Sequence, residues 1–278
     1  MKKILAIFDG TKYSEGASKY ALELAKASNS LLVGVFLNDL SYLSYTYAYG
    51  WEQPYIDYGA IIEQSREEDK EKIDLNIALF KRACEEKGIS YKIHLDKGVP
   101  FQEVIAESVF ADLLLIDSHT SFLTFGENTP SLFLKDVLTD SHCPVLVVPH
   151  HYTPFDKTVL CYDGNPSSIY AIKQFGYLFP ELSTMETTVV SINESHSRVL
   201  KDGSNLRDLV KQHYLKTNYE ILSGNIEDSL FEFLKVKGNN AIVVMGAYGR
   251  NALSRLFQQS LSNRIIKELH VPVFITHQ

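Results

Sequence analysis

The sequence is short of the features that mark secreted, membrane-spanning and nucleic-acid-binding proteins. It has three cysteines in 278 residues (Cys84, Cys143 and Cys161) and no C-x-x-C pair, which indicates a reducing compartment and thiols that serve as small apolar side chains. No apolar run approaches membrane-spanning length, and the N-terminal run ends at Asp9, too early for a secretory signal. The formal net charge of −7 argues against a protein that tracks nucleic-acid phosphates. We therefore expect a cytoplasmic protein without a membrane span or a nucleic-acid partner.

Short apolar runs alternate with amphipathic stretches, a pattern that predicts strands alternating with helices. The expected strands are residues 4–8, 31–37, 90–95, 112–116 and 145–149, followed by 158–162, 187–192, 217–222, 241–245 and 273–275. A charged helix is expected from about Ser65 to Gly88. Such alternation predicts an α/β fold, in which helices cover both faces of a doubly wound parallel sheet.

The chain contains the same layout twice. Asp9-Gly10 recurs 154 residues later as Asp163-Gly164, whereas Gly98 recurs after 126 residues as Gly224 and Pro144 after 128 as Pro272. The first copy therefore carries about 28 extra residues between Asp9 and Gly98, around the tyrosine-rich segment 42–58. This repeat predicts two domains, residues 1–150 and 155–278, joined by a short linker that contains His150 and His151.

The most informative stretch lies near the end of the chain. The predicted strand 241–245 runs into Gly246 and Gly249, and a helix begins about ten residues later near Ser260. Glycines allow backbone N–H groups to approach a phosphate, and a helix N-terminus favours negative charge. Ser260 and Ser262 add hydroxyl donors, and no Gly-Lys-Ser/Thr follows, so the stretch is an anion-binding turn of another type than a Walker loop.

This stretch resembles the Gly-x2-Gly-x9-Gly-Ser/Thr motif of the universal stress protein family. Gly246, Gly249 and Ser260 match it, while Gln259 stands in the place of the third glycine. With the repeat, the chain resembles a tandem member over nearly its whole length. The resemblance implies a five-stranded sheet per domain in the order 3-2-1-4-5. It also implies that the two fifth strands meet, which makes the chain an intramolecular pseudo-dimer; a homodimer of chains is a further alternative.

The resemblance also implies where an adenine nucleotide, ATP or a similar molecule, would bind in the second domain. In nucleotide-binding members the strand-one aspartate helps to hold the adenosine part and the glycine turn wraps the phosphates. Carried over, the nucleotide-binding residues are Asp163, Gly164, Ile192, Met245, Gly246, Gly249, Arg250, Gln259, Ser260, Leu261 and Ser262.

The first domain keeps Asp9, Gly10 and Thr11 but replaces the glycine turn with Asp117, Ser118 and His119. A carboxylate in that place would repel a triphosphate, so this crevice is expected to bind none. Asp117, His119 and Asp9 could be grouped into a metal or acid–base cluster. No ligand spacing supports one, and a solvated loop is the preferred interpretation, so no metal site is expected.

Two functions remain open on these grounds. The first is a stress-response regulator that binds an adenine nucleotide in its second domain. The alternative is a scaffold without nucleotide, which holds a protein partner or an apolar ligand through the first-domain crevice and the tyrosine-rich segment; that segment could equally be a lid or a cap over its own core. No catalytic residue is expected, because no base or metal carboxylate pair is visible; slow ATP hydrolysis stays open.

Overall fold

The computed structural model describes residues 2–39, 58–122, 129–193, 200–246 and 259–276. The tyrosine-rich segment up to residue 57, and with it the question of its role, lies outside the described residues, as do Gly249 and Arg250.

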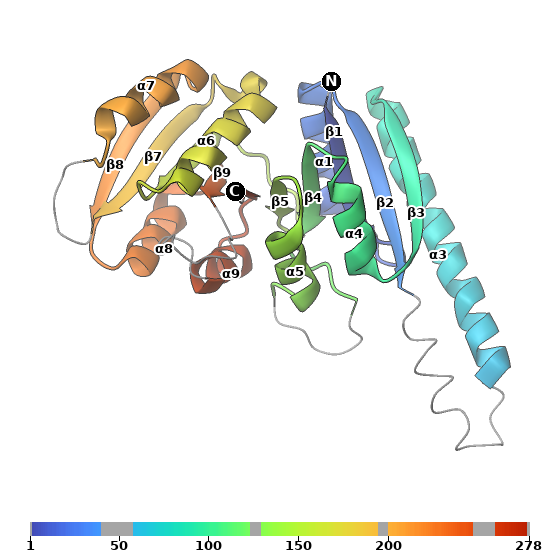
Figure 1. The fold of residues 1–278 in the computed structure, drawn as a ribbon. Coiled ribbons are helices and arrows are strands. Elements are labelled where there is room, and N and C mark those ends of the chain that lie inside the picture. The colour runs from blue at the N-terminus through green and yellow to red at the C-terminus, as the bar shows by residue number, and fades with distance from the viewer. Residues whose placement is uncertain (1, 40–57, 123–128, 194–199, 247–258, 277–278) are drawn as a thin grey trace.

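The described strands form one ten-stranded sheet in the order β3-β2-β1-β4-β5-β10-β9-β6-β7-β8 (Figure 1). The first half contains β1 (Lys3–Asp9), β2 (Leu31–Asp39), β3 (Tyr91–Gly98), β4 (Leu113–Asp117) and β5 (Val145–Val148). The second half contains β6 (Lys157–Tyr162), β7 (Glu186–Asn193), β8 (Lys216–Ser223), β9 (Ala241–Gly246) and β10 (Val273–Thr276). Each half is parallel in the order 3-2-1-4-5, which confirms the predicted fold class.

The two halves join through their last strands. β5 and β10 pair antiparallel, with Val147 opposite Val273 and Val145 opposite Ile275. All of these side chains are buried, because the seam lies in the middle of the sheet (Figure 1). The prediction that the fifth strands meet is therefore confirmed, and the pairing removes two apolar strand edges that would otherwise be open.

Helices cover both faces of the sheet. One face carries α1 (Glu15–Ala27), α3 (Tyr58–Lys87), α6 (Pro166–Leu178) and α7 (Gly203–His213), whose apolar residues belong to one core cluster. The other face carries α4 (Pro100–Ser108), α5 (Leu132–Asp140), α8 (Ile226–Lys237) and α9 (Gln259–Glu268), which share the second cluster. A short 3-10 helix, η2, spans Pro180–Leu182. None of the described helices is long and apolar enough to cross a membrane.

The helix expected from Ser65 begins earlier, at Tyr58. Its inner face buries Ile73, Phe80 and Cys84, and Ile62 adds a buried position one turn before the expected start. Helix α5 was not expected; Ser131 begins it by accepting a hydrogen bond from the backbone N–H of Leu134.

The connection between the halves is held against α1. The Tyr20 hydroxyl donates to the carbonyl of Thr153 at 2.8 Å and accepts from the backbone N–H of Thr153 at 3.1 Å. The ring of Tyr152 packs edge-on against Tyr20, with 4.7 Å between centroids. These contacts position the segment that leads out of β5, including His150.

Candidate functional site

The predicted crevice of the second half lies where β6 and β9 end. The two strands are parallel neighbours, with Leu160 opposite Val244, and each ends two residues further on, at Tyr162 and Gly246. The chain then leaves β6 toward α6 on one face and β9 toward α9 on the other. Ligands bind at such a switch point in doubly wound sheets.

Asp163 forms a tight turn directly after β6. Its Oδ1 accepts a hydrogen bond from the backbone N–H of Asn165 at 2.9 Å, and its Oδ2 accepts from the Asn165 side-chain amide at 2.7 Å. Gly164, between them, has φ +78°, a left-handed conformation that suits glycine. The carboxylate is only partly buried, so it can meet a ligand as well as stabilise its own turn.

Helix α6 begins beside this turn without a side-chain cap. Asn165 is the residue before Pro166, but its side chain makes no capping hydrogen bond to the helix, because its amide donates to Asp163. The first turn of α6 lies against the end of β9: a Cβ atom added to Gly246 would fall within the space of the Ser167 carbonyl and the Ser168 nitrogen. Gly246 thus has a packing role that its motif did not reveal.

Lys201 adds a positive charge that sequence reasoning missed. Its Nζ donates to the Gly164 carbonyl at 3.0 Å, and its carbonyl accepts from the Tyr162 hydroxyl at 3.0 Å. Burial raises the pKa of Tyr162, with smaller contributions from Asp202 and Asp163, so this hydroxyl remains a donor. Lys201 follows β7 in a segment without a motif, so only the fold brings it to the turn.

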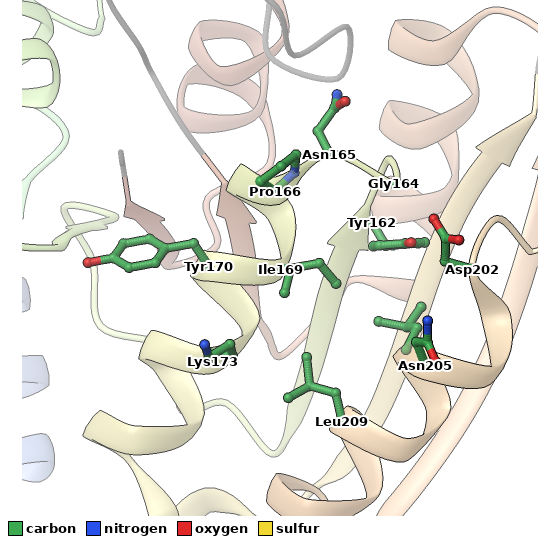
Figure 2. Close-up of a pocket in the computed structure, with 11 residues that line it drawn as sticks. Tyr162, Gly164, Asn165, Pro166, Ile169, Tyr170, Lys173, Asp202, Asn205 and Leu209 are labelled. Carbon is green, nitrogen blue, oxygen red and sulfur yellow. The ribbon is translucent and has the colours of Figure 1, made fainter.

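A cavity of about 490 Å³ borders the same turn on the helix side (Figure 2). Figure 2 shows Ile169, Tyr170 and Lys173 on α6 and Asn205 and Leu209 on α7 around it. Gly164 and Asn165 also line it, whereas the lining residues that the structure describes include none of β9 or α9. The cavity therefore opens between α6 and α7, beside the crevice between β6 and β9 rather than within it.

The remaining predicted residues of the second half are divided between core and crevice. Ile192 is partly buried near the end of β7. Met245 and Leu261 are fully buried in the core on the α9 side, so a nucleotide could contact them only through their backbone. Gln259, Ser260 and Ser262 lie in the first part of α9, where the backbone N–H groups of a helix N-terminus occur.

Asp9 in the first half forms the same kind of turn as Asp163. Its Oδ1 accepts from the backbone N–H of Thr11 at 2.9 Å and from the Thr11 hydroxyl at 2.8 Å, and Lys12 Nζ lies 3.4 Å from Oδ2. Gly10 donates its N–H to the carbonyl of Leu37 on β2. The turn after the first strand is thus repeated, as predicted.

Asp117, at the end of β4, is buried rather than part of a solvated loop, which corrects the sequence-based interpretation. Its side chain is 4% exposed, against 52% for His119 and 51% for His150. Oδ1 accepts from the backbone N–H of His119 at 2.7 Å, and Oδ2 accepts from the hydroxyl of Ser14. His150 Nδ1 lies 2.9 Å from Oδ2.

The grouping of Asp9, Asp117 and His119, which the sequence analysis set aside, also differs from the group that the structure forms. Among the described residues, the group that gathers around Asp117 contains His119 and His150, not Asp9. His150 is exposed on the connection between the halves, as predicted, but it also contacts Asp117. The cause is the sheet register: Asp117 pairs with Val148, so a residue two positions beyond β5 lies beside the end of β4. No sequence spacing signals this proximity.

Hydrogen-bond donors at the first-half crevice are already paired with the protein's own Asp117 carboxylate. Ser14 caps α1 by accepting from the N–H of Ala17, and it donates to Asp117. The Asp117 carboxylate also takes the N–H of His119, a donor that a glycine turn would offer to a phosphate. The protein's own carboxylate therefore occupies the donors that an anionic ligand would need.

Comparison with known proteins gives matches of three kinds: a family model, a curated relative and solved structures. A family model described as the universal stress protein family matches residues 1–149. A universal stress protein of Methanocaldococcus jannaschii is 29% identical over 150 residues, which are 53% of this chain and 81% of that protein. Two solved structures share the fold over almost the full chain. A universal stress protein of Archaeoglobus fulgidus has a TM-score of 0.68, 18% identity and coverage of 99% of this chain and 98% of that one. A functionally unknown protein of Pseudomonas aeruginosa has a TM-score of 0.60 and 15% identity, and the match covers 100% of this chain and 92% of that one.

Proposed function

The chain belongs to the universal stress protein family, and we propose that it is a cytoplasmic stress-response regulator that binds one adenine nucleotide, ATP or a close relative, in its second half. The proposed activity is binding rather than catalysis. The nucleotide would occupy the crevice between the ends of β6 and β9.

The observation that carries the proposal is the convergence of three groups at this switch point. The Asp163 turn, the uncapped first turn of α6 and the end of β9 lie together, and α9 begins on the opposite face at Gln259. A carboxylate can accept hydrogen bonds from a ribose or a base, and the helix N-termini favour phosphate. Lys201, at the Gly164 carbonyl, adds a cation that suits a phosphorylated ligand.

The first half supports a single site rather than two. Its corresponding crevice contains the buried Asp117 carboxylate, which already accepts hydrogen bonds from Ser14 and from the N–H of His119. A triphosphate there would meet a like charge and no free donors from these groups. We therefore propose one nucleotide per chain.

Calorimetric titration of the full chain with ATP, ADP and AMP tests the proposal. We expect a stoichiometry of one. Asp163→Asn keeps an oxygen acceptor for the N–H of Asn165 but removes the charge, and it should weaken binding about tenfold or more, since hydrogen bonds to charged groups contribute about 1.5–3 kcal/mol. The matched control is Asp9→Asn, which makes the same change in the turn of the first half and should leave the affinity unaltered.

Gln259→Gly removes the side chain at the first residue of α9, beside the helix N-terminus where the phosphates are proposed to bind. It should strengthen binding about fivefold to tenfold, which corresponds to a gain of about 1 kcal/mol. Two sites per chain, or a loss of affinity in Asp9→Asn equal to that in Asp163→Asn, would show that the assignment to the second half is wrong. If no adenine nucleotide gives a heat signal at millimolar concentration, the scaffold function replaces nucleotide binding as the proposed function.

A further inference from the structure

We propose that the first half contains a binding site for a first-row transition-metal dication, Zn²⁺ in the first place, formed by Asp117, His119 and His150. One ligand atom from each residue can be chosen so that all three lie within 4.8 Å of one another. This proposal does not depend on nucleotide binding in the second half.

The ligand set suits this class of ion. Two imidazoles and one carboxylate are nitrogen and oxygen ligands that Zn²⁺ accepts, whereas Mg²⁺ and Ca²⁺ prefer oxygen alone. Three protein ligands leave a fourth tetrahedral position open for water. The formal charge of the assembled site would be +1, so the ion would neutralise the buried Asp117 carboxylate and leave one positive charge at the surface.

The separations fit a small ion after minor side-chain rotation. Zn–N and Zn–O bonds of about 2.0–2.2 Å place tetrahedral ligand atoms roughly 3.3–3.6 Å apart. His119 Nδ1 lies 3.5 Å from Asp117 Oδ1, and His150 Nδ1 lies 2.9 Å from Oδ2. Both rings are about half exposed, so they can rotate to the required distance without disturbing the core.

Hydrogen bonds from neighbouring groups hold the Asp117 carboxylate in place, as is usual for ligands in metal sites. The Ser14 hydroxyl and the backbone N–H of His119 both donate to Asp117. Ser118, next along the chain, is buried, and its N–H donates to the Val148 carbonyl at 2.8 Å. One ligand is therefore fixed on a strand, and two half-exposed imidazoles face it, an arrangement that can admit an ion from solvent.

The three ligands come from two parts of the chain that the fold brings together. Asp117 ends β4, His119 lies in the following turn, and His150 lies on the connection toward β6. A bound ion would strengthen the existing His150–Asp117 contact, which holds that connection to the first half in addition to the Tyr20–Thr153 hydrogen bonds. Metal loading would thus reduce the mobility of the segment that joins the two halves.

Titration of untagged, chelator-treated full-length protein with Zn²⁺, in competition with a chromophoric chelator, tests the site. We expect one equivalent to bind with a dissociation constant in the micromolar range or below. Co²⁺ should give the intense visible absorption of a tetrahedral centre. His119→Ala and His150→Ala should each weaken Zn²⁺ binding by at least about tenfold, since even outer-shell changes cost 10–100-fold.

The matched control is His151→Ala, which removes a neighbouring exposed histidine whose ring contacts His150 but which is outside the three-residue group. It should bind Zn²⁺ as the unchanged chain does, and so should Asp163→Asn. Absence of saturation at one equivalent would overturn the proposal. So would unchanged affinity in the His119→Ala, His150→Ala double variant, or an equal loss in His151→Ala, which would indicate adventitious surface binding.

Discussion

Gly246 is the position where a packing role and a phosphate role can be separated by experiment. The motif assigns it to backbone approach by a phosphate, yet the structure places the first turn of α6 directly against it. In Gly246→Ala the new Cβ would meet the carbonyl of Ser167 and the nitrogen of Ser168. Backbone atoms at a helix start cannot rotate away as a flexible side chain can, so α6 or β9 must shift.

The expected cost follows from this contact. Overpacking of a well-filled interior costs about 1–3 kcal/mol. With a urea m-value of about 3 kcal/mol per molar for a chain of this size, the unfolding midpoint should fall by about 0.3–1 M. The loss should be present without any nucleotide, because it arises from the protein's own backbone.

Urea unfolding followed by circular dichroism, without ligand, measures the effect. Gly98→Ala is the matched control: its Cβ would meet only the Glu103 carboxylate, 2.7 Å away at the end of a flexible side chain, so its midpoint should change little. If Gly246→Ala unfolds at the same urea concentration as the unchanged chain, the steric reasoning is refuted. A loss of nucleotide affinity in such a stable variant would then assign Gly246 to the ligand.

Three further expectations concern the buried thiols and the seam between the halves. Burial raises the pKa of Cys84 and of Cys143 to about 12 and raises the pKa of Cys161 as well. None of these thiols should therefore react with a thiol reagent at pH 8 until the chain unfolds. Rapid labelling of the native protein would contradict this expectation. Because these thiols stay protonated in the folded state while unfolded thiols ionise, stability should fall as the pH rises from about 9 to about 12. Cleavage of the chain between residues 150 and 157 should leave two fragments that elute together, since β5 and β10 remain paired; separate elution would argue against the seam.

The sequence predicted the sheet well because its central strands are buried on both faces. Runs such as 113–116 and 241–245 are continuously apolar, so their type and order follow from alternation with helices and from the repeat. The pairing of the fifth strands was implied by the family resemblance, and it covers two short apolar edges. The start of α3 was misplaced because residues 58–64 carry little apolar periodicity, although Ile62 is buried once α3 is packed.

The site was predicted less completely, because its contacts depend on neighbours distant in sequence. His150 approaches Asp117 only through the β4–β5 register, and Lys201 approaches Gly164 only through the path of the chain after β7. The packing role of Gly246 depends on how closely α6 lies to β9, and the spacing of glycines in the sequence does not predict that distance. Motifs identify the ends of strands; the side chains that gather there are set by the register and by helix packing.

The end of the fourth strand favours ions of opposite charge in the two halves. In the first, Asp117 carries a negative charge that is tied to Ser14 and faced by two imidazoles, so this place favours a cation. In the second, Gly246 carries no side chain, and the neighbouring α6 begins without a side-chain cap beside Lys201 and the Asp163 turn. An unshielded helix N-terminus favours an anion. The difference between Asp117 and Gly246 therefore suits a cation in the proposed metal site and an anion in the proposed nucleotide site, and one continuous sheet contains both positions.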